Sequence, residues 1–580
     1  MIKVPIPLIA ANVLAAAIMW LVLLAIGARV RSWCRFPVGG TLRWSTDLAL
    51  GAWLTSMVIL AAGLVGLVGR LPLVAIVAAL ACVGRWRVRR PILPLAVATV
   101  GGLIYLPVAL GPPFFYDALV YHLGLPWQAL IEGGWKPHPE NLFSTFPPLS
   151  QMLSMPAMAL GLLRVPALLH WLAWVTAATA VYGLARRFGA SGPIAGLATA
   201  AALVLPVTPL VPGFPAAEGW LLVALLAAVT LAIGPCRPGS AALAGLLAGV
   251  ATAARLQGIP WSLLVVLLVG IQCRGRLRIL GVTAGCWLIG ASPWWFKNLV
   301  LLGDPTAPVF WRREGMETLW RDSHSLLKRG ASVFESLVSV PGRLAPELVW
   351  LLPLLLVGLS AVLFSHRRVV LVGLVLFGLA VWPATGGLPR FLAPTACLLL
   401  ALAATAGGGD RVRRLAAAAA ISWCIVVGAT RGAQWLDRIG VHHLVTLDLE
   451  AAVALVSPNS PMGAFTESED LAADARVLFV AEPRSLAFPR RFITPSQHDV
   501  QPLRSLIETS ENPDSISTEL RRRGFTHLLI NWNELGRLGD AYPVAPWRTA
   551  MGQRRWSEFL RSLGPPVVQN SGVQIYQLPH

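Results

Sequence analysis

Apolar runs of about 15–25 residues recur along this 580-residue sequence, and they constrain its fold more than any other feature. A helix of this length crosses the hydrocarbon core of a bilayer. Only 13% of the residues are charged and the mean hydropathy is +0.66, whereas soluble domains carry about 25% charged residues. The sequence therefore predicts an α-helical polytopic membrane protein with about 12–14 spans.

The candidate spans alternate with short basic loops. The spans are residues 6–28, 46–69, 71–84, 91–110, 165–185, 193–211, 217–234, 239–254, 259–272, 279–299, 345–364, 369–384, 389–407 and 412–430, with a further short helix at 150–163. Residues 6–28 are interpreted as a retained span and not as a cleaved signal peptide, because Arg29, Arg31 and Arg35 follow the run in place of small residues.

The basic loops predict the orientation of the chain. They are residues 29–35, 84–90, 185–187, 274–278, 366–368 and 410–414. Alternating spans put all of them on one side, which the positive-inside rule makes cytoplasmic. The extracytoplasmic side then receives residues 111–150, 212–217, 300–344, 385–390 and everything after 430. We therefore expect a multi-pass protein of the inner (cytoplasmic) membrane.

The net charge of +19 is unevenly distributed along the chain. Residues 1–430 hold 32 Lys and Arg against 12 Asp and Glu, whereas residues 431–580 hold 15 against 16. Most of the excess lies in loops between apolar runs, as the positive-inside rule requires. The charge therefore gives no reason to expect a nucleic-acid partner.

Residues 431–580 differ in character from the apolar bundle. Residues 476–482 and 525–532 are predicted strands, residues 515–524 a helix ending in glycine, and residues 573–578 a candidate last strand. This pattern predicts a small extracytoplasmic α/β domain. It contains no glycine-rich phosphate-binding motif, so nucleotide binding is not predicted.

The cysteines offer no sign of a metal site. All seven precede residue 430, and none are spaced as Cys-x-x-Cys. They are Cys34, Cys82, Cys236, Cys273, Cys286, Cys397 and Cys424. The arrangement suggests neither a structural zinc site nor a disulfide framework.

Polar side chains concentrate in residues 116–150, between two apolar runs. They are Asp117, Tyr121, His122, Glu132, His138, Glu140 and Asn141. A carboxylate within a bilayer is costly, so acids there usually line a cavity or serve a function. If a helix begins near Asp117, Tyr121 lies one turn further on. The alternative interpretation is a solvated loop with interfacial aromatic residues.

Four further charged residues fall at the outer ends of candidate spans. They are Glu218, Arg255, Lys297 and Arg390. Glu218 is also compatible with an ordinary acid at a helix N-terminus, and Arg255 with a snorkelling interfacial side chain. Together with Asp117, this charge set can activate a nucleophile and stabilise a phosphate leaving group.

Five stretches give the sequence a specific resemblance to a known family. They are DALVYHLGLP from Asp117 followed by NLFSTFPPL from Asn141; AAEGW around Glu218; GLLAGVATAAR ending at Arg255; SPWWFKNLVLLGDP around Lys297; and PRFLAP around Arg390. Their order and spacing over residues 90–410 resemble the GT-C superfamily of polyprenyl-phosphate-sugar-dependent membrane glycosyltransferases. The bacterial branch similar to protein mannosyltransferases and the lipid A aminoarabinose transferase is the nearest.

The resemblance implies a division of the chain and a reaction. Residues 1–90 would be an N-terminal transmembrane extension, residues 91–430 a GT-C-like catalytic core with the outer loop 111–150, and residues 431–580 the extracytoplasmic domain. The reaction would be an inverting transfer of a sugar from a polyprenyl-phosphate donor to a lipid, polysaccharide or protein acceptor. No cofactor is expected, and a divalent metal is not favoured because His122 and His138 show no ligand spacing.

The resemblance also implies roles for single residues. Asp117 matches the general base, and Glu218 matches a second acid that is often Asp in the family. Arg255 matches a donor-phosphate contact that is commonly Lys. Two further donor-phosphate positions match Lys297 and Arg390, and the acceptor side of the outer loop is assigned to Tyr121, His122 and Asn141.

Three other functions compete with this interpretation. A transporter or lipid flippase would place charges near the bilayer midplane and show internal repeats, whereas these charges lie at the outer edge. A glycan ligase or polymerase would use larger lipid-diphosphate-linked donors. A sensor with an external ligand-binding domain would not need the set of Asp117, Glu218 and Arg255.

Overall fold

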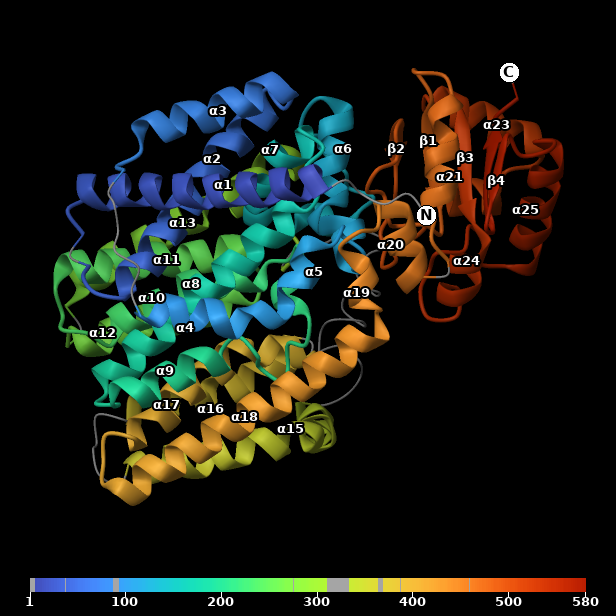
Figure 1. Cartoon of the computed structure of the whole chain (residues 1–580). Helices are drawn as coiled ribbons and strands as arrows, with labels where there is room; N and C mark the ends of the chain where they lie inside the picture. Colours follow the sequence, from blue (N-terminus) through green and yellow to red (C-terminus); the bar gives the residue numbers. More distant parts are fainter. Residues whose placement is uncertain are drawn as a thin grey trace.

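The computed structural model describes residues 6–36, 38–86, 93–274, 276–309, 333–362, 369–385, 387–457 and 459–579. The basic loop 366–368, most of the basic loop 84–90 and part of the outer loop 300–344 lie outside the described residues. The described chain forms a large helical bundle followed by a small α/β domain (Figure 1).

Eight helical segments in the described part of the chain are long and apolar enough to cross a membrane. They are α1 (Ile6–Trp33), α2 (Leu42–Leu64), α4 (Leu93–Gly102) continued by η1 (Leu103–Tyr105) and α5 (Leu106–Leu110), α8 (Val165–Arg187), α13 (Leu277–Leu302), α15 (Val333–Val362), η6 (Pro389–Leu392) continued by α17 (Ala393–Ala406), and α18 (Arg411–Arg438). Shorter apolar helices are α3 (Arg70–Val83), α9 (Gly192–Ala201), α10 (Glu218–Ala232), α11 (Pro238–Ala254), α12 (Gly258–Gln272) and α16 (Val369–Ala384). Each predicted span overlaps one of these helices, so the predicted polytopic bundle is confirmed.

The predicted span 193–211 is wrong in its second half. Helix α9 ends at Ala201, and residues 202–217 run through turns and the short 3-10 helix η4 (Val211–Gly213). Prolines at 206, 209, 212 and 215 explain the break, because proline has no N–H to donate and clashes with the preceding turn. Most of this non-helical stretch is buried in the bundle, where irregular backbone is tolerated at membrane depth.

Helices α11 and α13 pack with their backbones in close contact. A Cβ atom on Gly249 would lie 2.1 Å from the carbonyl oxygen of Trp287, and one on Gly290 would lie 2.2 Å from that of Leu246. Small residues permit such approach in membranes, where van der Waals packing drives helix association. The contact fixes the position of α11, whose C-terminal end is followed by Arg255.

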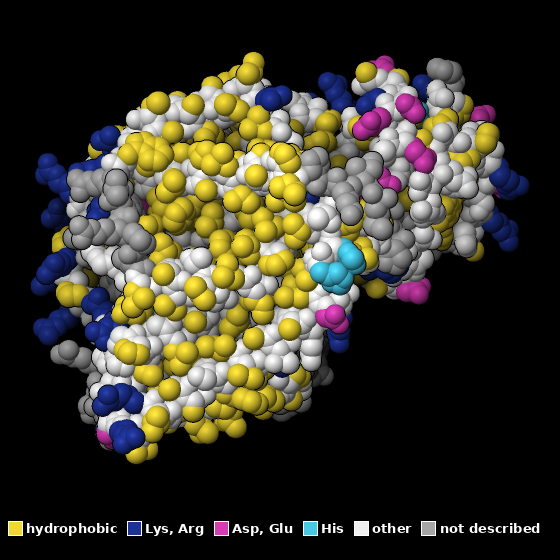
Figure 2. Space-filling model, in the orientation of Figure 1, with side chains coloured by type: hydrophobic (Ala, Val, Ile, Leu, Met, Phe, Trp, Pro, Cys, Tyr) yellow, Lys and Arg dark blue, Asp and Glu magenta, His cyan; other side chains and the backbone are white. Residues whose placement is uncertain are grey.

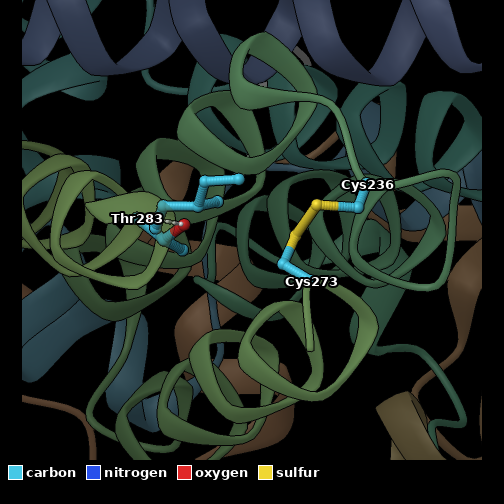
Figure 3. The surroundings of a disulfide bond; sticks show 4 residues. Cys236, Cys273 and Thr283 are labelled. Carbon is cyan, nitrogen blue, oxygen red and sulfur yellow. Dashed lines mark hydrogen bonds between the residues drawn. A yellow bond between two sulfur atoms is a disulfide. The ribbon is translucent and has the colours of Figure 1, made fainter. Parts of the chain in front are cut away.

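A disulfide joins Cys236 to Cys273 (Figure 3). Cys236 precedes α11 and Cys273 follows α12, so the bond closes the open end of a helical hairpin across a sequence separation of 37 residues. The expectation that the cysteines form no disulfide is therefore wrong for this pair. No spacing rule signals the bond, because the two residues meet only when α11 packs against α12.

The C-terminal domain contains a five-stranded sheet of order β2-β1-β3-β5-β4. The strands are β1 (Arg476–Val480), β2 (Arg491–Ile493), β3 (His527–Asn531), β4 (Val568–Asn570) and β5 (Val573–Gln577). Strand β1 is parallel to β2 and β3, whereas β5 is antiparallel to β3 and β4. The predicted α/β domain is thus confirmed; β2 and β4 were not predicted, because three-residue strands leave no clear sequence period.

Helices flank this sheet or connect it to α18. They are α19 (Val441–Leu444), α20 (Leu449–Val456), α21 (Met462–Glu467), η7 (Ser468–Asp470), α22 (Leu503–Thr509), α23 (Pro513–Arg522), α24 (Trp532–Leu538) and α25 (Ala550–Ser562). Alternate residues of β1 bury against different sides: Leu478 and Val480 join the core with α22, α23 and α25, whereas Val477 and Phe479 join the core that is continuous with the bundle. This is the period of two expected of a strand with both faces covered.

The outer segment between α5 and α8 is fastened to the C-terminal domain. It contains η2 (Ala118–His122), α6 (Gly124–Glu132), η3 (Leu142–Thr145) and α7 (Leu149–Ala159), and Figure 1 shows α6 beside the strand β2. The Trp127 indole donates to the Phe488 carbonyl at 2.8 Å, and the Gln128 amide donates to the Phe492 carbonyl at 3.1 Å. Two hydrogen bonds therefore join α6 to the chain at and just before β2.

The surface of the bundle agrees with a membrane-embedded protein. Figure 2 shows apolar side chains spread over its visible face, with Lys and Arg gathered at the end away from the C-terminal domain and others at the far edge of that domain. The exposed large apolar residues include Leu14, Leu21, Val100, Leu267, Leu415 and Val426. Soluble proteins rarely expose an apolar surface of this extent to water.

Candidate active site

A single π-helical turn opens the site. Residues Ala118–His122 form this turn, in which the Leu123 N–H donates to the Ala118 carbonyl at 2.9 Å. Such turns occur frequently at functional sites. Asp117 precedes the turn at its N-cap position, and the Tyr121 hydroxyl lies 3.4 Å from Asp117 Oδ2. The prediction that Tyr121 lies one turn beyond Asp117 is confirmed.

Four charged side chains from different elements form one continuous ion-pair network. Arg390 Nη2 lies 2.7 Å from Asp117 Oδ2, and Arg390 Nε lies 3.4 Å from Glu218 Oε1. Arg255 Nη1 lies 2.6 Å from the same Glu218 oxygen. The order Asp117–Arg390–Glu218–Arg255 alternates acid and base, so every charge has an opposite neighbour.

Helix ends position these groups. Glu218 is the first residue of α10, Arg255 follows the last residue of α11, and Arg390 lies in the 3-10 turn that precedes α17. The ring of Phe391 lies 4.6 Å from the Arg255 guanidinium and 5.7 Å from that of Arg390. These cation–π contacts hold both guanidiniums against one aromatic ring.

Asp117 and Glu218 differ in how far their side chains are exposed to solvent. The Asp117 side chain is 24% exposed, whereas that of Glu218 is 2% exposed. The remaining oxygen of Glu218 accepts the backbone N–H of Ala217 at 3.2 Å. Asp117 is therefore accessible to a substrate, while Glu218 lies behind the two arginines and holds them.

Two cavities meet the network from different sides. A cavity of about 380 Å³ is lined by Arg255 with Tyr121 and His122 and by apolar residues that include Leu256, Ile259 and Phe391. A larger cavity of about 700 Å³ is lined by Asp117 and Arg390, by the buried stretch 207–214 and by residues of the C-terminal domain. The ion-pair network thus contributes residues to the walls of both.

His122 and Tyr121 are buried beside the network. Their ring centroids are 4.2 Å apart. Burial lowers the pKa of His122 to about 3, so the imidazole is neutral at physiological pH. Burial also raises the pKa of the Tyr121 hydroxyl, and the neighbouring Asp117 carboxylate adds to this effect. Both side chains can donate or accept hydrogen bonds without carrying charge.

Lys297 and Asn141 have partners outside the ion-pair network. The Lys297 ammonium donates to the carbonyls of Ser144 and Phe146, the latter at 2.7 Å. The Asn141 amide donates to the Thr494 carbonyl at 3.0 Å. In this geometry both residues hold the outer segment in place, and their predicted contacts with donor phosphate and acceptor stay predictions.

Several polar residues of the larger cavity were missed by sequence reasoning. They are Tyr116, Asn459, Arg484, Glu534 and Arg537. Arg484 follows the end of β1 and Glu534 follows the end of β3, and the carboxyl ends of parallel strands are where α/β domains bind ligands. That rule is the signal that would have singled them out.

Metal binding has no visible basis in the described residues. Among them, no group of three or more His, Cys, Asp or Glu side chains is placed to hold a metal ion. His138 lies between two carboxylates, but it contacts Glu132 through Nε2 and Glu140 through Nδ1, each at 3.1 Å. One metal ion cannot use both ring nitrogens of one histidine.

Comparisons with known proteins concern the fold. Protein-family models and curated proteins give no match. The chain is similar to the apo structure of ArnT from Cupriavidus metallidurans, with a TM-score of 0.53 and 14% identity over 84% of this chain and 97% of that chain. ArnT bound to undecaprenyl phosphate gives a TM-score of 0.49 and 12% identity over the same shares. The archaeal oligosaccharyltransferase AglB from Archaeoglobus fulgidus gives a TM-score of 0.41 and 13% identity over 76% of this chain and 69% of that chain.

The similarity to apo ArnT shows a shared fold over most of both chains. ArnT is the lipid A aminoarabinose transferase, and this is the fold that the GT-C resemblance implied. The predicted fold class is therefore confirmed.

Proposed function

We propose that this protein is an inverting glycosyltransferase, which moves a sugar from a polyprenyl-phosphate donor to an acceptor hydroxyl at the extracytoplasmic face of the membrane. One observation carries the proposal: the accessible Asp117 carboxylate is ion-paired to Arg390 at 2.7 Å, in a network that lines two separate cavities. A transferase needs two binding sites that meet at one reacting centre.

The smaller cavity suits the donor. Its lining is mostly apolar, with the Arg255 guanidinium at the network end. A polyprenyl chain would pack on the apolar lining, and its phosphate would be neutralised by Arg255 and Arg390. Guanidinium groups bind phosphate oxygens in pairs and keep their charge even when partly buried.

The larger cavity suits the acceptor. Asp117 accepts the proton of the acceptor hydroxyl, and the resulting oxygen attacks the anomeric carbon of the donor sugar. The bond between that carbon and the phosphate oxygen breaks, and polyprenyl phosphate leaves with the bonding electrons. Arg255 and Arg390 stabilise the negative charge that develops on the leaving phosphate. Attack opposite the leaving group inverts the anomeric centre.

Glu218 acts in this scheme as a positioning residue. Its buried carboxylate orders both arginines before any ligand arrives. Preorganised charge costs no rearrangement during the reaction, which is why such sites stabilise transition states well.

The test is donor turnover by purified full-length protein and by Asp117→Asn. Both receive a panel of undecaprenyl-phosphate-linked sugars with a bacterial envelope lipid extract as acceptor. We expect the wild type to release polyprenyl phosphate and the variant to be slower by about 10²–10⁴-fold, the usual contribution of a general base. Equal rates in the two proteins would remove Asp117 from the mechanism. No turnover of any donor by folded wild type would overturn the transferase proposal.

A further inference from the structure

The C-terminal sheet contains a topological switch point. Strand β1 lies between β2 and β3 and is parallel to both. The connection from β1 runs to β2, and the chain then crosses to β3 on the opposite side. In open α/β sheets, a crevice opens at the carboxyl edge where the strand order reverses in this way, and ligands bind there.

Charged and amide side chains fill this edge. Glu482 and Arg484 follow β1, and they pair at 2.6 Å with both side chains fully buried. Asn531 ends β3 and donates to Glu482 at 2.6 Å. Glu534, in the first turn of α24, accepts from Arg537 at 2.5 Å. The edge is therefore rigid, with Arg537 as its exposed member at 48% side-chain exposure.

The crevice opens onto the same cavity as Asp117. Arg484, Glu534 and Arg537 line one wall of the 700 Å³ cavity, and Asp117 lines another. Tyr116, the neighbour of Asp117, lies between these walls: its ring is 5.5 Å from the Arg484 guanidinium and 5.4 Å from that of Arg537. The Tyr116 hydroxyl is buried and has no hydrogen-bond partner among the described residues. In a cavity wall, such a hydroxyl is available to pair with a polar group of a ligand or with water.

The remaining wall of the cavity is apolar. It is formed by Leu210, Phe214, Trp435, Ile439 and Val456. Trp435 lies near the end of the membrane span α18 that faces the C-terminal domain, and it is 44% exposed. Tryptophan favours the boundary between lipid and water. The cavity thus has one polar wall on the C-terminal domain and one apolar wall at the membrane boundary.

We infer that the larger cavity binds a lipid-linked acceptor whose hydroxyl-bearing head group occupies the switch-point crevice. Arg537, Asn459 and the Tyr116 hydroxyl contact the head group, and its apolar part lies along Leu210, Phe214 and Trp435. This arrangement presents one acceptor hydroxyl to Asp117. The inference rests on the proposed transferase function, and it makes the C-terminal domain the part that selects the acceptor.

The test compares Arg537→Gln and Tyr116→Phe with the wild type and with the control Arg522→Gln. Arg522 is an arginine of the same domain with a 73% exposed side chain, away from the cavity. Three acceptors are supplied with a turned-over undecaprenyl-phosphate sugar: total glycolipids of a bacterial envelope, the same material after removal of its acyl chains, and a serine-containing peptide.

We expect transfer to the intact glycolipids only. Arg537→Gln and Tyr116→Phe should raise the KM for the glycolipid by about tenfold, the effect of one lost hydrogen bond to a charged or buried group. The KM for the donor should not change, and Arg522→Gln should match the wild type.

Two results would overturn the inference while leaving the transferase intact. One is equal transfer to the deacylated material or transfer to the peptide, which would exclude a lipid-linked acceptor. The other is an unchanged glycolipid KM in both variants, which would exclude the crevice. If the wild type transfers to none of the three acceptors, equilibrium binding of the glycolipids to wild type and Arg537→Gln is measured instead. Weaker binding by Arg537→Gln supports the crevice as the acceptor site. Equal binding by the two proteins overturns the inference. If the wild type turns over no donor, that result counts against the proposed transferase function and not against the crevice.

Discussion

Arg390 and Asp117, 273 residues apart in sequence, form an ion pair in which Nη2 lies 2.7 Å from Oδ2. The same guanidinium reaches Glu218 through Nε at 3.4 Å. One planar group thus joins the accessible acid to the buried one. The pair is possible because η6 and the outer segment meet at the same end of the bundle.

Replacing Arg390 with lysine should damage catalysis even though the charge is kept. An ammonium is a point charge and cannot contact both carboxylates in the geometry of a planar guanidinium. We expect kcat for sugar transfer to fall by about 100-fold, the scale of losing one stabilising group at a transition state. The control is Arg431→Lys, whose arginine pairs with Glu347 at 2.8 Å outside the site. A comparable loss of kcat in both variants would contradict the catalytic role of the Arg390 guanidinium.

Replacing Glu218 with glutamine should destabilise the protein. The change leaves two arginines with Asp117 as their remaining carboxylate partner, and an unmatched charge at a largely buried position costs about 3–5 kcal/mol. Thermal unfolding in detergent should therefore show a clear drop in Tm. Glu519→Gln is the control, because that acid pairs with exposed arginines on the surface of α23 and surface pairs contribute little. A Glu218 variant as stable as this control would contradict the positioning role.

Comparing two variants distinguishes a structural role of Lys297 from a role in binding donor phosphate. Its ammonium donates to the carbonyls of Ser144 and Phe146, so Lys297→Met should lower the Tm by removing the donor for both. Its affinity for undecaprenyl phosphate should stay within about twofold of wild type, whereas Arg255→Gln should lose at least tenfold, or about 1.4 kcal/mol. A tenfold loss in Lys297→Met would instead support the predicted contact with donor phosphate.

His138 should make stability depend on pH. Burial lowers its pKa, but hydrogen bonds and charge from Glu132 and Glu140 outweigh burial and raise the pKa to about 9, above about 6.5 for an unfolded histidine. The folded state therefore binds an extra proton. The resulting stabilisation is complete below pH 6.5 and is lost as the pH rises through 9.

The measurement is Tm between pH 6 and pH 9.5 for wild type and His138→Gln. The wild type should lose Tm across this range relative to the variant, whose curve should be flatter. His442→Gln is the matched control, because His442 is exposed, and its curve should follow the wild type. Parallel curves for all three proteins would show that His138 is not protonated in the fold.

Arg164 should control how the C-terminal domain is attached. It is buried and donates to the carbonyls of Leu110, Val445 and Leu447, at 2.5, 2.6 and 2.8 Å. Arg164→Gln cannot reach all three, so residues 440–448 should be cleaved faster by added protease. Arg186→Gln, which changes an exposed arginine at the far end of α8, should be cleaved at the wild-type rate. Equal protection in both variants would show that other contacts carry the attachment.

Hydrophobic patterning was sufficient to predict the helical bundle. Asp117, Glu218, Arg255 and Arg390 were singled out by their places at the ends of apolar runs and by the GT-C resemblance, and the structure joins these four in one ion-pair network. Two features were not predicted. The prolines after Ala201 end α9 within an apolar run, and Cys236 meets Cys273 only through helix packing.

The sequence by itself determined the helices, the small α/β domain and the set of charged residues at the ends of apolar runs, because the apolar period and the position of a charge along a run are local properties. Only the tertiary structure decided which charges pair, which acid is accessible and which domain completes the larger cavity. Partners such as Asp117 and Arg390 lie hundreds of residues apart, so their contact depends on how the helices pack. The same holds for Tyr116 and Arg537, whose meeting gives the cavity its polar wall.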